Sequence, residues 1–192
     1  MKKLFLTLCL VVVNVVSAGA QEITSADIEA LYNRVMTDKH LTDVTEGVRT
    51  WKPRTEYPGA ECLNFANWAF HELHGRMAGS RDGTSHNLMR NNGVTVVFRF
   101  PEKDKLDDLE LALQTGRIHP GDFIQWSRNS DGFSHHSAIY GDYDGVNHKI
   151  RILDSNRSKV WNQVKYEWMP IKTFKYRCER GVAFYSVKPK KQ

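Results

Sequence analysis

Hydrophobic residues recur every three to four positions in parts of the chain and every second position in others. The longer period is typical of amphipathic helices, and the period of two is typical of half-buried strands. The helical pattern covers Thr24–Met36, the segment from Cys62 to His74, and Lys103–Thr115. Strand patterns cover Val94–Phe100, Phe123–Ser127, His135–Gly141, His148–Asp154 and Gly181–Val187, with Val160–Trp168 as a further candidate. Helices followed by a run of short strands predict an α+β domain with a mainly antiparallel sheet.

The segments between these elements predict connections. Residues 37–60 have little periodicity and contain Pro53 and Pro58, so we expect an extended connection there. Residues 78–93 are rich in Gly, Ser, Asn, Asp and Arg and predict a long loop. We find no internal repeat and no low-complexity linker, and 192 residues suit one domain. We therefore expect a single domain over residues 21–192.

The first twenty residues have the layout of a secretory signal peptide. Lys2 and Lys3 precede an apolar run over Leu4–Val16, and the small residues Ala18–Ala20 follow it. The apolar run is short for a bilayer span and is interrupted by Asn14. We expect cleavage after Ala20, a secreted or periplasmic protein, and no transmembrane helix in the mature chain.

Composition narrows the choice of partners. The formal net charge is +5, and losing Lys2 and Lys3 with the signal peptide leaves +3. The chain has no long run of arginines interleaved with aromatic residues, so we expect no nucleic-acid partner. His71 and His74 lie three residues apart, which differs from the metalloprotease helix pattern, and no third ligand is evident. We expect no metal and no cofactor.

Cys62 is the first candidate for chemistry. The turn formers Pro58 and Gly59 lead directly into its helix, so the thiol lies in the first turn and on the apolar stripe. The positive end of the helix dipole favours thiolate and lowers the pKa of such a cysteine. The arrangement is typical of a nucleophile that needs a base.

A predicted β-hairpin supplies the base. Alternation puts His136 on the same face of its strand as Ala138, and Asp154 on the buried face of the return strand. If the hairpin is centred near Gly145, His136 lies opposite Asp154, whereas a register shift of two residues puts Asn156 there. Either partner would orient the imidazole, and His136 would take the proton of Cys62.

Several motifs resemble the CHAP domain, the family of cysteine- and histidine-dependent amidohydrolases and peptidases. The similarity covers roughly residues 55–160. It is carried by Cys62 after a Tyr- and Gly-containing approach, by Pro120-Gly121-Asp122-Phe123-Ile124-Gln125-Trp126, by His136-Ser137-Ala138-Ile139-Tyr140 and by Leu153-Asp154-Ser155-Asn156. The resemblance implies a papain-like fold with catalytic Cys62, His136 and Asp154 and with Asn156 as a further polar member. It also implies cleavage of amide bonds in bacterial peptidoglycan, with a stem peptide as substrate.

Three further residues are candidates for substrate binding: Tyr57, Glu61 and Trp126. Glu61 stands where the resembled family often has glutamine, which departs from the expected oxyanion donor. Trp126 is expected either to line the groove and stack on sugar or to pack in the core.

Two other functions fit the same sequence. One is a secreted cysteine protease or amidase that acts on a protein outside the cell wall. The other is a non-catalytic exported binding module in which Cys62 and Cys178 form a disulfide, since an oxidising compartment favours pairing of the two mature cysteines.

Overall fold

The computed structural model describes residues 22–59, 61–81, 88–127, 135–157 and 160–187. The predicted signal peptide, residues 1–20, lies outside the described residues. The helices are α1 (Ser25–Thr37), α2 (Glu61–His74), α3 (Asp108–Gln114) and α4 (Ile171–Arg177). The strands are β1 (Thr42–Thr45), β2 (Val48–Trp51), β3 (Gly79–Arg81), β4 (Leu88–Arg90), β5 (Val94–Phe100), β6 (Phe123–Ser127), β7 (His135–Asp144), β8 (Lys149–Ser155), β9 (Val164–Pro170) and β10 (Val182–Val187).

A six-stranded sheet forms the centre of the fold, with strand order β5-β10-β6-β7-β8-β9. Every neighbouring pair in this sheet is antiparallel. The predicted α+β class with a mainly antiparallel sheet is therefore confirmed.

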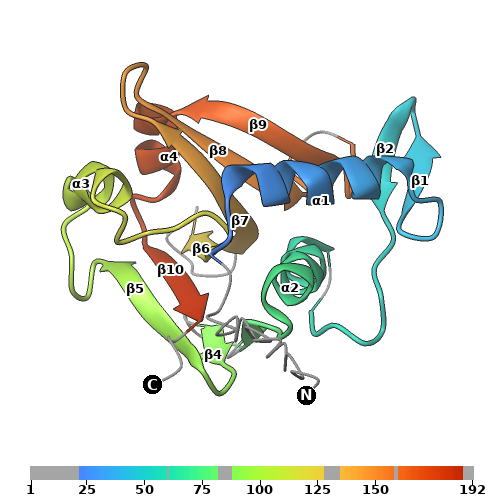
Figure 1. The fold of residues 1–192 in the computed structure, drawn as a ribbon, viewed down its shortest axis with the longest axis horizontal. Helices are drawn as coiled ribbons and strands as arrows, with labels where there is room; N and C mark the ends of the chain where they lie inside the picture. The colour runs from blue at the N-terminus through green and yellow to red at the C-terminus, as the bar shows by residue number, and fades with distance from the viewer. Residues whose placement is uncertain (1–21, 60, 82–87, 128–134, 158–159, 188–192) are drawn as a thin grey trace, which may run out of the picture.

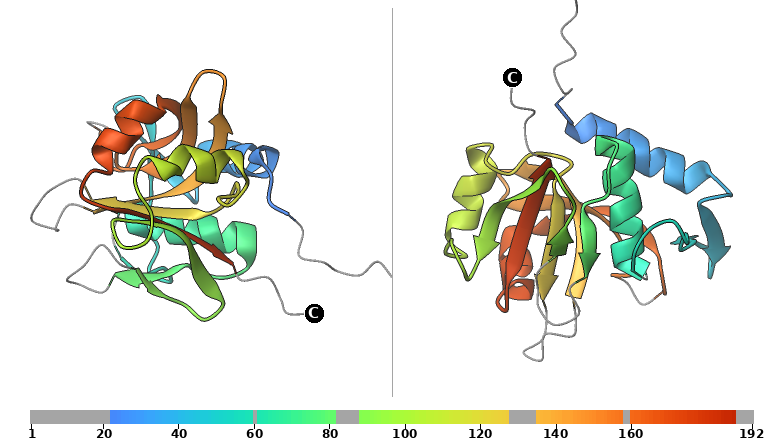
Figure 2. Two further views of the ribbon diagram at one scale, coloured as in Figure 1. Left: turned by 90° about the vertical axis from the view of Figure 1, so that its left-hand side faces the viewer. Right: turned by 90° about the horizontal axis from the view of Figure 1, so that it is seen from below.

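Helices cover both faces of this sheet (Figure 1). One core lies between the sheet and helices α1 and α2, and the other between the sheet and helices α3 and α4 (Figure 2). Neighbouring strand residues contribute to opposite cores: Phe123 and Ile139 pack on the α2 side, and Ile124 and Ala138 pack on the α4 side. Both faces of the central strands are thus buried.

Helix α1 begins with a reciprocal cap. The Thr24 hydroxyl accepts from the Asp27 amide at 3.3 Å, and the Asp27 carboxylate accepts from the Thr24 amide at 2.8 Å. This satisfies amide groups that have no partner within the helix. Thr24 is therefore the N-cap of α1.

The connection predicted over residues 37–60 is wrong in part, because it contains the hairpin β1–β2. Its turn residues Glu46 and Gly47 both have positive φ, at 51° and 78°, as two-residue hairpin turns require. The hairpin ends at Trp51, whose ring packs on Phe65 and Trp68 of α2, with centroids 5.1 and 4.9 Å apart. The hairpin therefore anchors the chain just before the cysteine segment.

Three further expectations need correction. The long loop predicted over residues 78–93 contains β3 and β4, which at three residues each are too short to show alternation. Helix α3 begins at Asp108 rather than near Lys103, because the Asp104 carboxylate accepts from the Arg99 amide at 2.9 Å and holds the preceding turn. Helix α4 was not predicted, since seven residues give a weak periodic signal.

No helix within the described ranges is both long and apolar enough to cross a bilayer.

Candidate active site

Cys62 is the second residue of α2, and the loop before it is held in place by Asn64. The buried Asn64 amide donates to the carbonyls of Arg54 and Tyr57, both at 2.8 Å. Its oxygen accepts from the Trp51 indole at 3.1 Å and from the Arg54 amide at 2.9 Å. One side chain thus satisfies several backbone groups of an irregular segment and fixes where α2 starts.

The residue before Cys62 has an unusual conformation. Glu61 has a φ of 53°, in the left-handed region that residues with a side chain rarely adopt. Its carboxylate oxygen Oε2 accepts from Nδ2 of Asn156 at 2.5 Å. Asn156, just beyond β8, also has a positive φ of 65°. Such strain is often found at functional sites, and here it occurs on both sides of one contact.

Strands β7 and β8 form the predicted hairpin, with a different register from the one centred near Gly145. Ala138 pairs with Asp154, and the register shifts at Gly141, between Tyr140 and Asp142. A Cβ on Gly141 would lie 2.5 Å from the Tyr166 ring, so this position of the bulge requires glycine. The register is displaced by two residues from the one centred near Gly145. Because residues two apart share a face of a strand, His136 and Asp154 stay on one face, and their side chains meet diagonally.

The structure brings Cys62, His136 and Asp154 together. Nε2 of His136 lies 2.8 Å from Oδ2 of Asp154. The Cys62 thiol is hydrogen bonded to the His136 side chain and to the backbone amide of Ser137. Since Nε2 faces Asp154, the other ring nitrogen, Nδ1, is the one available to the thiol.

The electrostatics of this cluster favour an ion pair. Burial acts to lower the pKa of His136, but hydrogen bonds and charge from Asp154 and Cys62 outweigh it and raise the pKa to about 9. Burial acts to raise the pKa of Cys62, and contacts with His136 and the Ser137 amide outweigh it, so that this pKa is lowered. Both shifts favour the thiolate and imidazolium pair over the neutral pair.

Asp154, rather than Asn156, bonds to the histidine. The sequence left both residues open as partners of His136, and the hydrogen bonds separate them: Asp154 contacts His136, and Asn156 contacts Glu61. Asn156 also accepts from the Asn162 amide at 3.3 Å. Its role is to join β8 to the start of α2, beside the nucleophile.

Arg157 is a member of the cluster that sequence reasoning missed. Its Nε lies 2.6 Å from Oδ2 of Asp154, and only 10% of its side chain is exposed. An arginine three residues after an acidic residue at a strand end gives no sequence signal, because the contact depends on how the chain turns beyond β8.

Trp126 and Tyr57 do not face the thiol as substrate-binding residues would. Trp126 is 2% exposed, and its ring packs on His136 with centroids 4.6 Å apart. The structure therefore favours packing over sugar stacking. The Tyr57 hydroxyl lies 2.9 Å from Nδ1 of His71. His71 is nine residues after Cys62, roughly 13 Å along the helix axis.

Cys62 and Cys178 do not form the disulfide expected for a binding module. Cys178 is completely buried in the core under α3 and α4, whereas α2 carries Cys62 against the other face of the sheet. Burial also raises the pKa of Cys178 well above its ordinary value, so this thiol stays protonated.

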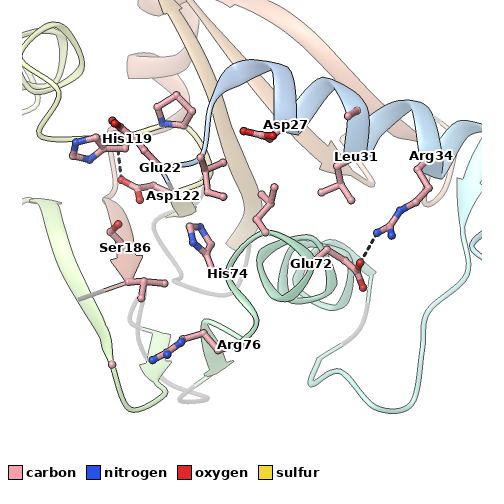
Figure 3. A pocket seen from close by; sticks show the side chains of 16 residues that line it. Glu22, Asp27, Leu31, Arg34, Glu72, His74, Arg76, His119, Asp122 and Ser186 are labelled. Carbon is pink, nitrogen blue, oxygen red and sulfur yellow. Dashed lines mark hydrogen bonds and ion pairs between the residues drawn. The ribbon is translucent and has the colours of Figure 1, made fainter. Parts of the chain in front are cut away.

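A groove of about 1120 Å³ lies at the far end of α2, between this helix, α1 and the start of β6 (Figure 3). His74, at its edge, donates from Nε2 to the Gly121 carbonyl at 3.0 Å. The groove also contains Asp122, whose burial raises its pKa to about 7. His74 is twelve residues after Cys62, roughly 18 Å along the helix, so this groove does not lead to the thiol.

Among the residues that the structure describes, no group of three or more His, Cys, Asp or Glu side chains is placed to hold a metal ion.

A scan against protein-family models found no matching model, and comparisons with the curated proteins and with the solved structures found no similar chain.

Proposed function

We propose that this protein is an exported cysteine amidohydrolase or endopeptidase with a papain-like fold, acting on amide bonds of bacterial peptidoglycan. The observation that carries the proposal is the contact series Cys62, His136, Asp154, in which an acidic thiol meets a basic imidazole backed by a buried carboxylate. These are the groups that acyl transfer through a thioester requires.

The chemistry follows from the protonation states. The Cys62 thiolate attacks the carbonyl carbon of the amide, and the tetrahedral intermediate collapses when His136 gives its proton to the leaving amine. Neutral His136 then takes a proton from water, whose oxygen attacks the thioester carbon. The carbon–sulfur bond breaks, the carboxylic acid is released, and Cys62 leaves as thiolate beside the His136 imidazolium, which restores the starting pair. Asp154 keeps Nε2 oriented throughout these steps.

The start of α2 supports the negative charge of the intermediate. The first amides of a helix have no partner within the helix and point toward its N-terminal end, where Cys62 lies. The Cys62 amide is the donor we assign to the oxyanion. Glu61 replaces the glutamine of the resembled family, so backbone donors take a larger share of this role.

The substrate class rests on the sequence motifs that resemble the CHAP domain, and the secreted or periplasmic location rests on the signal peptide. The test is digestion of purified peptidoglycan with analysis of the released muropeptides. Wild type should release new amino and carboxyl ends, and Cys62→Ala should release none. Cys178→Ala, which alters the buried thiol on the other face of the sheet, should retain activity. Unchanged cleavage by a folded Cys62→Ala variant would exclude the mechanism.

The burial of Trp126 favours one alternative substrate. Without this ring as a sugar platform, the same residues serve a secreted protease or amidase that acts on a protein outside the wall. Peptide libraries separate the two: cleavage of unmodified peptides with intact walls left untouched identifies the protein substrate.

A further inference from the structure

Asp154 is a fully buried carboxylate with few compensating groups. Its exposed fraction is 0%, and Oδ1 has no hydrogen-bond partner in the described part of the chain. Both close contacts use Oδ2, which lies 2.8 Å from His136 and 2.6 Å from Arg157. A buried carboxylate is costly unless it is paired, so the charge of Asp154 depends on these two groups for compensation.

His136 cannot stabilise this charge through the whole reaction. In the resting state the imidazolium is cationic, but after it protonates the leaving amine it is neutral. At that stage Arg157 is the cation in contact with Asp154. A guanidinium does not lose its proton in proteins, so it compensates the carboxylate in both stages.

Arg157 is itself held in place. Its side chain is 10% exposed, and Nη2 lies 3.8 Å from the Glu167 carboxylate on β9. The contacts form a series of alternating charges from Glu167 through Arg157, Asp154 and His136 to Cys62. The series links the sheet edge to the nucleophile.

We propose that Arg157 is a positioning residue for the reaction. Its guanidinium compensates the negative charge of the buried Asp154 and holds Oδ2 against Nε2 of His136, and thereby maintains the imidazolium that activates Cys62. The inference rests on the proposed function, because it assigns Arg157 a part in the same thiolate and imidazolium pair.

The test is the pH dependence of Cys62 alkylation by iodoacetamide, which needs no substrate. In Arg157→Gln, the buried charge of Asp154 loses its permanent cationic partner, and Oδ2 is no longer held against His136. We expect the midpoint at which Cys62 becomes reactive to rise by about one unit, a roughly tenfold loss of rate on the acid side. Arg157→Lys keeps the positive charge beside Asp154, so the alkylation midpoint of this variant should stay within about half a unit of the wild-type value. In an Asp154→Asn background, Arg157→Gln should add no further shift.

Arg151→Gln is the matched control. Arg151 lies on β8, is 22% exposed and pairs with Glu29 rather than with Asp154. The Arg151→Gln variant also removes one positive charge, from the strand that precedes Arg157, and should leave the midpoint unchanged.

The outcomes separate the two proposals. A folded Arg157→Gln variant with the wild-type midpoint overturns the positioning role, whereas a wild-type Cys62 midpoint near the ordinary thiol value overturns the proposed function itself. If Arg157→Gln does not fold, the double variant with Asp154→Asn decides, because it removes the charge that Arg157 compensates. Recovery of folding supports the inference, and failure to recover overturns it.

Discussion

The side-chain amide of Asn156 donates to the carboxylate of Glu61, and this contact joins the end of β8 to the first residue of α2. Cys62 lies on α2, and β8 carries Asp154, the carboxylate that orients the base His136. The contact therefore sets the distance between helix and sheet beside Cys62, and it holds a negative charge next to the thiol.

The charge of Glu61 raises the pKa of Cys62, against the stronger effect of His136. Glu61→Gln removes this charge and retains an oxygen that accepts from Asn156. We expect the midpoint of Cys62 alkylation to fall by less than about one unit, since Glu61 is partly exposed to solvent. Glu72→Gln, roughly 16 Å further along the same helix, should not move it. A rise in the midpoint with Glu61→Gln would contradict this account.

The protonated state of His136 sets the alkaline limit of activity. Its pKa is raised to about 9, so the stabilisation of the imidazolium is fully present below the ordinary value of 6.5 and is lost as the pH rises through 9. Asp154→Asn removes the carboxylate, and the alkaline limb of the rate profile should move from about 9 toward 6.5. The pH dependence of hydrolysis measures this shift, and an alkaline limb that stays near 9 would show that Asp154 does not raise this pKa.

Asn64 should contribute strongly to stability. In Asn64→Leu, the buried carbonyls and amides of the loop before α2 lose their partner, which costs about 2 to 4 kcal/mol when several groups are left unsatisfied. Urea unfolding measures the loss. Asn91→Ala removes one exposed contact to the Met77 carbonyl and should cost less than about 0.5 kcal/mol. Equal losses for the two variants would show that the loop does not depend on Asn64.

Trp126 should affect folding rather than substrate binding. Trp126→Phe leaves a cavity beside His136 and Phe174, and we expect a loss of about 1 to 3 kcal/mol with little change in KM. Thermal unfolding and steady-state kinetics measure the two effects. A large rise in KM at unchanged stability would instead assign the ring to the substrate.

The sequence predicts the reacting residues better than it predicts the residues that hold them in place. Periodicity alone places Cys62 in the first turn of a helix, and alternation places His136 on the face that Asp154 shares, because each depends on a local pattern. Register does not decide between Asp154 and Asn156, because Asp154 lies opposite Ala138 and its side chain still reaches His136 diagonally.

Residues that hold the site in place are harder to predict when their contacts involve irregular segments. Arg157 and Asn64 act through contacts that exist only once the chain has folded, and neither lies in a recognisable motif. The β1–β2 hairpin did have a signal, since Glu46-Gly47 stands between two short polar and β-branched segments. The papain-like arrangement and the enzymatic activity stay predictions.

The reacting groups are also far apart along the chain, since 73 residues lie between Cys62 and His136. In an unfolded chain Cys62 is an ordinary, weakly acidic thiol, and it becomes reactive when α2 docks on β7. The rate at which rapid alkylation appears during refolding therefore measures this docking step. In an incompletely folded chain, Cys62 lacks this enhanced reactivity.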